Sequence, residues 1–153
     1  MNTKGSLFED FAEALFVAVN GFTIRYKRAK AKASKTEPEH DYDLIIQNIS
    51  KVFTEFGNYI LVECKGWKEP VGYPEIAKFL HKLHSRKCST GIIIALGGVV
   101  YSEFNPTLKR TFDQDGIAVL VIDKKDINKV INFSVNLASL LRKKYEQVRF
   151  GLI

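Results

Sequence analysis

Two nearly uninterrupted apolar runs constrain most strongly what this chain of 153 residues can fold into. Residues 91–96 and 117–122 contain almost no polar side chain. A strand shows this pattern when both of its faces are covered, because neither face then has to meet water. The two runs therefore predict strands in the interior of a sheet that carries helices on both faces.

Patterns in the rest of the chain supply the other elements of such a fold. Helices are expected where apolar residues recur at helical spacing or between capping residues, in 6–20, 74–85, 105–115 and 123–148, the last as one helix or as two divided at Ser134. Three further strands are expected from short apolar runs at 22–26, 43–47 and 59–64. The order predicts one α/β domain over residues 1–153, α-β-β-β-α-β with a further α-β-α. Its central sheet is mixed, because the early strands form antiparallel pairs and the later ones are joined by helical crossovers.

Charge and cysteine content limit the kinds of partner. Lys and Arg number 23 against 17 Asp and Glu, a net charge of +6 that favours a polyanionic partner. The basic stretch that begins at Lys27 has almost nothing to bury, so we expect a flexible basic loop at about 27–40. Two cysteines are too few for a disulfide scaffold, and no apolar run is long enough to cross a bilayer. These features predict a cytoplasmic protein without a membrane segment.

Three residues on neighbouring strands have the types that phosphodiester hydrolysis needs. Alternation along a strand places Glu63 and Lys65 on one face and the Cys64 side chain on the other. Asp43 opens the adjacent strand, so its carboxylate is expected at the same end of that face. Two carboxylates suit Mg²⁺, which activates water and polarises a phosphoryl oxygen, while an ammonium group stabilises the developing charge.

Simpler interpretations remain open at this stage. Glu63 and Lys65 also fit an exposed ion pair, and Cys64 fits core packing. Glu9 either contributes to the site or completes a capping box with Ser6, and Glu13 is an alternative acidic residue one turn later.

Short motifs distributed along the chain resemble the PD-(D/E)xK nuclease superfamily, in particular Mrr-type restriction endonucleases and archaeal Holliday-junction resolvases. The matching segments are Lys4-Gly5-Ser6-Leu7-Phe8-Glu9, Gly21-Phe22, Asp43-Leu44-Ile45-Ile46, Val62-Glu63-Cys64-Lys65, Gly91-Ile92-Ile93-Ile94-Ala95 and Gly116-Ile117 to Val121-Ile122-Asp123. Together they cover about residues 4 to 127.

The resemblance implies a restriction-endonuclease-like core and a DNA endonuclease that uses Mg²⁺, with Mn²⁺ as a substitute. It assigns catalysis to Asp43, Glu63, Lys65 and Glu9, and metal binding to Asp43, Glu63 and the backbone carbonyl of Cys64. The sequence departs from the family pattern in three ways. Asp43 is not preceded by proline, Glu63 stands where Mrr-type proteins commonly have glutamine, and the Asp-to-Glu spacing is long.

Candidate DNA contacts are the basic residues of the expected loop and the residues just beyond the Glu-x-Lys motif, namely Lys27, Arg28, Lys30, Lys32, Trp67 and Lys68. Defence against foreign DNA is favoured over junction resolution, and a non-catalytic DNA-binding or assembly module is the alternative from another class. A homodimer or a partner chain would supply recognition. The apolar residues between 127 and 141 would form that interface or cover the sheet.

Overall fold

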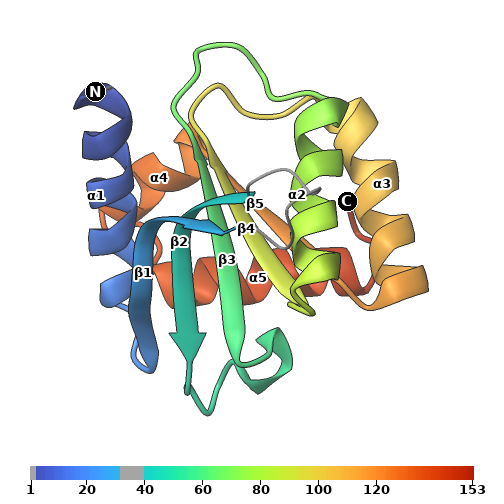
Figure 1. Ribbon diagram of the computed structural model, residues 1–153, viewed down its shortest axis with the longest axis horizontal. Coiled ribbons are helices and arrows are strands. Elements are labelled where there is room, and N and C mark those ends of the chain that lie inside the picture. The colour runs from blue at the N-terminus through green and yellow to red at the C-terminus, as the bar shows by residue number, and fades with distance from the viewer. Residues whose placement is uncertain (1–2, 32–39) are drawn as a thin grey trace.

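The computed structural model describes residues 3–31 and 40–153. Its elements follow the predicted order (Figure 1). They are α1 (Thr3–Val17), β1 (Phe22–Ala31), β2 (His40–Asn48), a short 3₁₀ helix η1 (Thr54–Phe56), β3 (Tyr59–Lys65), α2 (Tyr73–Ser85), β4 (Thr90–Ala95), α3 (Tyr101–Asp115), β5 (Ala118–Asp123), α4 (Lys124–Ile131) and α5 (Leu137–Arg149). None of the helices in this part of the chain is long and apolar enough to span a membrane.

The five strands form one mixed sheet in the order β1-β2-β3-β4-β5. The pairs β1–β2 and β2–β3 are antiparallel, whereas β3–β4 and β4–β5 are parallel. Side chains from Thr90 to Ala95 are all buried, and those from Ala118 to Ile122 are buried as well. The prediction of a mixed sheet with two fully covered strands is therefore confirmed.

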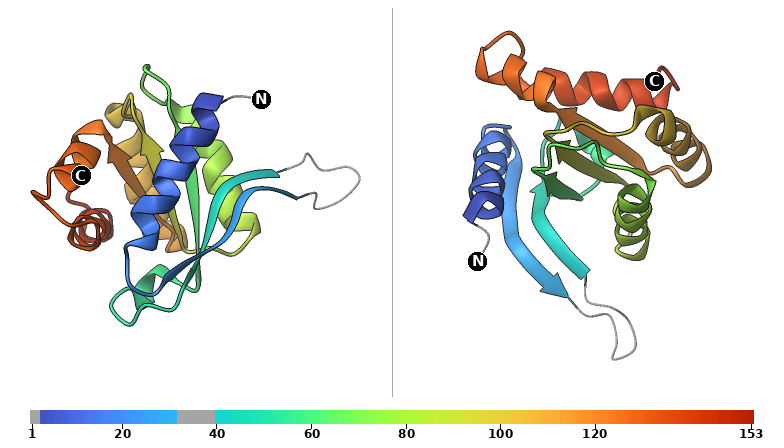
Figure 2. Two further views of the ribbon diagram at one scale, coloured as in Figure 1. Left: turned by 90° about the vertical axis from the view of Figure 1, so that its left-hand side faces the viewer. Right: turned by 90° about the horizontal axis from the view of Figure 1, so that it is seen from above.

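Helices cover both faces of this sheet (Figure 2). Residues of α1, α4 and α5 share one core cluster with the sheet, which includes Phe16, Ile127 and Leu141. Residues of α2 and α3 share the other, which includes Phe79 and Phe104. Of the apolar residues between 127 and 141, Ile127, Leu137, Leu140 and Leu141 cover the sheet, whereas Ile131 and Phe133 are exposed, so both alternatives that the sequence left open keep some of these residues.

Strands β2 and β3 separate before β3 ends. Their last paired positions are Leu44 and Val62, whereas β2 stays paired with β1 as far as His40 and Ala31. The β1–β2 pair consequently turns away from the rest of the sheet, as both views in Figure 2 show. Asp43 and Glu63 are the next positions beyond the last β2–β3 pair, so both lie where the strands part.

Three sequence-based expectations are corrected by the backbone. Helix α1 begins at Thr3, so Ser6 lies inside the helix and is not its N-cap. Helix α3 begins at Tyr101, and Pro106 lies within it rather than at its start. The buried Phe104 explains the earlier start, because its packing against the second core cluster requires helix before the proline.

The expected basic loop is the third correction. Residues from Lys27 to Ala31 belong to β1, and they are paired with β2 through a register shift near Tyr26. Composition alone indicated a loop because these side chains bury little, but the ladder satisfies their backbone groups and thereby makes them a strand. Residues 32–39, which include Lys32, lie outside the described part of the chain.

Candidate active site

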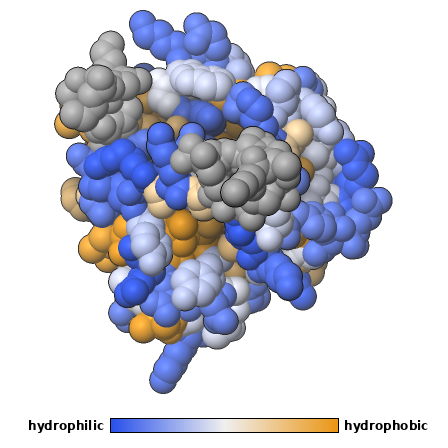
Figure 3. Space-filling view, viewed as in Figure 1, coloured by the Kyte–Doolittle hydropathy of each residue, from blue (hydrophilic) through white to orange (hydrophobic). Residues whose placement is uncertain are grey.

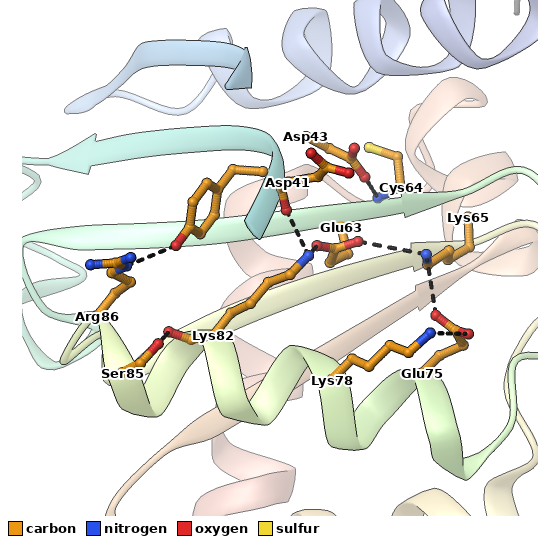
Figure 4. A network of polar contacts seen from close by, with 11 residues as sticks. Asp41, Asp43, Glu63, Cys64, Lys65, Glu75, Lys78, Lys82, Ser85 and Arg86 are labelled. Carbon is orange, nitrogen blue, oxygen red and sulfur yellow. Dashed lines mark hydrogen bonds and ion pairs between the residues drawn. The ribbon is translucent and has the colours of Figure 1, made fainter. Parts of the chain in front are cut away.

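Asp43 reaches β3 with its side chain at the point where the ladder has ended. Its Oδ2 accepts a hydrogen bond of 2.7 Å from the Cys64 backbone N–H (Figure 4). The N–H and C=O groups of one strand residue point toward the same neighbouring strand. The Cys64 carbonyl therefore also points to the β2 side, where the ladder provides no partner.

Glu63 and Lys65 occupy the same face of β3, as the alternation predicted. Glu63 is only 8% exposed, and its Oε2 lies 3.7 Å from Lys65 Nζ. Lys65 also lies 3.5 Å from Glu75 Oε2 and 5.1 Å from the centre of the Trp67 ring. The Lys65 ammonium is thus held beside Glu63 by neighbours on two sides.

Helix α2 adds charged residues that sequence reasoning missed. Lys82 Nζ lies 2.6 Å from Glu63 Oε1, and Glu75 contacts both Lys65 and Lys78. Figure 4 shows Lys82 and Glu75 pointing from α2 toward Glu63 and Lys65, while Lys78 runs along the helix to Glu75. The signal was present in the spacing, because positions 75, 78 and 82 share one face of a helix whose neighbouring stripe is apolar.

A pocket of about 300 Å³ brings these groups together. It is lined by Asp41, Asp43, Glu63, Cys64, Lys65, Trp67, Glu75, Lys78, Phe79 and Lys82. All three predicted residues of the Asp43, Glu63 and Lys65 set line it, together with Cys64.

The carboxyl groups of Asp43 and Glu63 both have raised pKa values. Burial raises the pKa of Asp43, as does the charge of Glu9, while the bond from the Cys64 amide works in the opposite direction. Burial and the charge of Asp43 raise the pKa of Glu63, against the lowering effect of Lys82. Two carboxylates that are both costly to ionise are stabilised by a nearby cation.

The donor set at this point fits a magnesium ion. In the described part of the chain, no cluster of three or more His, Cys, Asp or Glu side chains has metal-binding geometry. Mg²⁺ does not need one, since it typically uses one or two carboxylates and keeps several waters. The Asp43 and Glu63 carboxylates and the Cys64 carbonyl are all oxygen donors, which Mg²⁺ and Mn²⁺ prefer.

Glu9 lies on α1, which covers the face of the sheet opposite to α2. Its charge acts on the pKa of Asp43, and its Oε2 accepts a hydrogen bond of 3.0 Å from Arg28 Nη1. Glu13, the alternative acidic residue, contacts Lys27 at 3.2 Å. Glu9 is therefore the acidic residue of α1 that influences the pocket electrostatically, although it does not line it.

The predicted DNA-contacting residues fall into different environments. Lys27 pairs with Asp10 at 2.7 Å, and Arg28 pairs with Glu9, so both are tied to α1. Lys30 on β1 and Lys68 beyond β3 are exposed. Trp67 is 45% exposed and borders the pocket, so its ring is accessible to a base that would stack on it.

Cysteine and histidine side chains near the pocket are either unreactive or do not line it. Burial and the neighbouring charges of Asp43 and Glu9 raise the pKa of the Cys64 thiol, so it stays protonated and packs against the core. His81 and His84 are exposed on α2 and do not line the pocket.

A family model, Mrr_cat, described as a restriction endonuclease, matches residues 1–131. No curated protein matches the chain in sequence. Among solved structures, the chain is similar to the DNA modification-dependent restriction endonuclease AspBHI. The two are 12% identical, with a TM-score of 0.49, and the match covers 92% of this chain and 34% of that one. The chain thus spans about a third of that protein's length.

Proposed function

Since the chain belongs to the restriction endonuclease family Mrr_cat, which its residues 1–131 match, we propose that it hydrolyses DNA phosphodiester bonds with Asp43, Glu63 and Lys65 in a Mg²⁺-dependent reaction. The family match confirms the resemblance to Mrr-type nucleases, and the mixed five-stranded sheet agrees with the expected core. The observation that carries the proposal is the meeting of two carboxylates and an ammonium group in one pocket where β2 and β3 separate.

The roles follow from position and chemistry. Asp43, Glu63 and the Cys64 carbonyl would hold the divalent ion, which supplies Lewis-acid polarisation and a water of lowered pKa when bound. Lys65 stands beside Glu63 with its ammonium group, which can orient the attacking water or stabilise charge on the phosphoryl group. Glu9 acts through the charge that it places near Asp43.

Surface features support DNA as the substrate. The chain has a net charge of +6, and the face in Figure 3 is mostly hydrophilic. Trp67 and Lys68 follow the catalytic strand directly and are exposed, so stacking and phosphate contact are available beside the pocket. Lys30 adds an exposed cation on the projecting β1–β2 pair.

Substitution of Lys65 tests the proposal. We expect purified wild-type protein to nick or cut plasmid DNA in Mg²⁺ or Mn²⁺ but not in EDTA. We expect Lys65→Ala to lose this activity while keeping the wild-type circular dichroism spectrum. Equal cutting by Lys65→Ala would contradict the catalytic assignment. Salt-sensitive DNA binding that ignores EDTA, without cleavage in any divalent ion, would instead support a non-catalytic binding module.

The biological role that we propose is restriction of foreign DNA in the cytoplasm, by a homodimer or with a partner chain. The family description supports restriction over junction resolution. A comparison of plasmid with a synthetic four-way junction at equal concentrations distinguishes the two, because a resolvase would cut the junction preferentially.

A further inference from the structure

Beyond the end of their ladder, β2 and β3 are joined by a hydrogen bond from the backbone of one strand to a side chain of the other. The last backbone pair is Leu44 with Val62, and the bond from the Cys64 amide to Asp43 lies just past it. A further connection between β2 and β3 comes from a side chain of helix α2. Lys82 on α2 donates to the backbone carbonyl of Asp41 at 2.6 Å and to Glu63 Oε1 at 2.6 Å.

The Lys82 ammonium is therefore a bridge between the strand that carries Asp43 and the side chain of Glu63. Figure 4 shows it between the two strands, with one dashed contact to each. It binds Oε1 of Glu63 and leaves Oε2, which faces Lys65 at 3.7 Å. One oxygen of Glu63 is thus anchored while the other remains directed into the pocket.

Packing around helix α2 holds the Lys82 side chain in position. The Lys82 side chain is only 16% exposed, and its ammonium lies 5.9 Å from the centre of the Tyr42 ring. Helix α2 is packed onto β4 through the buried Phe79 and Leu83, which lie so close to Gly91 that no side chain fits there. The position of Lys82 is therefore set by the packing of the helix rather than by the strands that it joins.

We propose that Lys82 is a positioning residue of the metal site, which holds Glu63 and the Asp43-bearing strand at the separation that a divalent ion requires. The inference rests on the proposed function, because it assumes that these carboxylates bind a metal. Groups that hydrogen-bond to a metal-binding carboxylate hold it in the orientation that the metal needs, and the loss of such a group typically costs roughly 10- to 100-fold in metal affinity. Lys82 has this role toward Glu63, although it lies on a different element.

The electrostatic effect and the positioning effect of Lys82 on cation affinity have opposite signs. Removing a positive charge beside a cation site strengthens cation binding, because a repulsion disappears. Removing a positioning contact weakens it, because the ligands must be ordered when the ion binds. Weaker binding after neutralisation of Lys82 would therefore identify positioning, since the electrostatic effect alone has the other sign.

Calorimetric titration of Mn²⁺ into the full chain separates these effects. The variants are Lys82→Met, Lys82→Arg and the matched control Lys78→Met. Lys78 lies one turn earlier on α2, is 72% exposed and contacts Glu75 rather than Asp43 or Glu63. Melting temperatures establish that each variant folds, and Lys82→Gln replaces Lys82→Met if the latter does not.

We expect Lys82→Met to bind Mn²⁺ roughly 10- to 100-fold more weakly than wild type. Lys82→Arg should recover most of the affinity, since a guanidinium group also donates to two oxygens. Lys78→Met, which removes the same charge, should bind no more weakly than wild type. Unchanged or tighter binding by a folded Lys82→Met variant would overturn the positioning role, as would Lys82→Arg binding no better than Lys82→Met. Absence of Mn²⁺ binding by the wild type would instead contradict the proposed function and this inference together.

Discussion

At the scale of single residues, the pocket places negative charge where the fold tolerates it poorly. Burial raises the pKa of both Asp43 and Glu63, and each is further affected by another acidic side chain. A carboxyl whose pKa is higher in the folded than in the unfolded state stabilises the fold at low pH and destabilises it as the pH rises. At neutral pH the buried carboxylates of Asp43 and Glu63 therefore destabilise the fold when no cation is bound beside them.

Neutralising Asp43 is therefore expected to stabilise the metal-free protein. Asp43→Asn keeps an oxygen that accepts the Cys64 N–H but removes the buried charge. We expect a melting temperature a few degrees above wild type at pH 7 in EDTA. The difference should shrink as the pH falls, and vanish below the ordinary value of 3.8, where the wild-type carboxyl is protonated in both states.

Thermal denaturation followed by circular dichroism between pH 7 and pH 3 measures this difference. An Asp43→Asn variant less stable than wild type at pH 7 would contradict the destabilising effect of the buried charge. A gain that persisted unchanged at the lowest pH would show that its origin is not the ionisation of Asp43.

At the scale of secondary structure elements, the site depends on how closely α2 packs against β4. A Cβ atom on Gly91 would lie 2.6 Å from two carbons of the Phe79 ring and 2.8 Å from Leu83 Cδ1. The absence of a side chain at this position lets the helix approach the sheet closely. This approach brings Glu75 and Lys82 to the pocket on β3.

Gly91→Ala should therefore disturb both stability and activity. Overpacking of a core contact costs about 1 to 3 kcal/mol, and any outward shift of α2 also moves Lys82 away from Glu63. Urea denaturation measures the first effect and plasmid cleavage the second. Gly66→Ala is a control for stability, because its Cβ would meet only Phe8 at 3.9 Å. A fully stable and fully active Gly91→Ala variant would contradict this account of the packing.

At the scale of the whole molecule, the described part of the chain contains one proposed catalytic cluster, which would cut one strand at a time. Symmetric cutting of both strands of a duplex requires two such sites, as in a homodimer. If the chain acts as the proposed dimer, the rate of linear product formation from supercoiled plasmid should rise more steeply than the first power of protein concentration. Sedimentation with and without DNA tests the association directly. Accumulation of nicked plasmid as the final product at all concentrations would indicate a monomeric nickase.

The predictable part of the site lies within single strands. Glu63 and Lys65 could be placed on one face because side chains alternate along a strand, and this holds wherever the strand lies in the sheet. The Asp43 side chain could not be placed with the same security. Its position depends on where β2 and β3 stop pairing, and pairing is a property of two segments separated by a connection of uncertain conformation.

The basic stretch from Lys27 is a second case in which local sequence could not predict the structure. Its composition indicates a solvated segment, yet its residues up to Ala31 extend β1, and Lys27 and Arg28 pair with carboxylates on α1. Partners supplied by another element are not visible in local composition. The same holds for Lys82, whose two acceptors lie on two strands distant in sequence.

The amino-acid sequence alone determined the order of helices and strands, the mixed sheet and the residue types of the proposed catalytic set, because hydrophobic periodicity and short motifs are local properties of a chain. Tertiary structure decided the separation of β2 from β3, the meeting of Asp43 with Cys64, and the arrival of Lys82 and Glu75 from α2. These depend on packing between elements far apart in the chain, such as α2 against Gly91, where distances are set by the shapes of both partners.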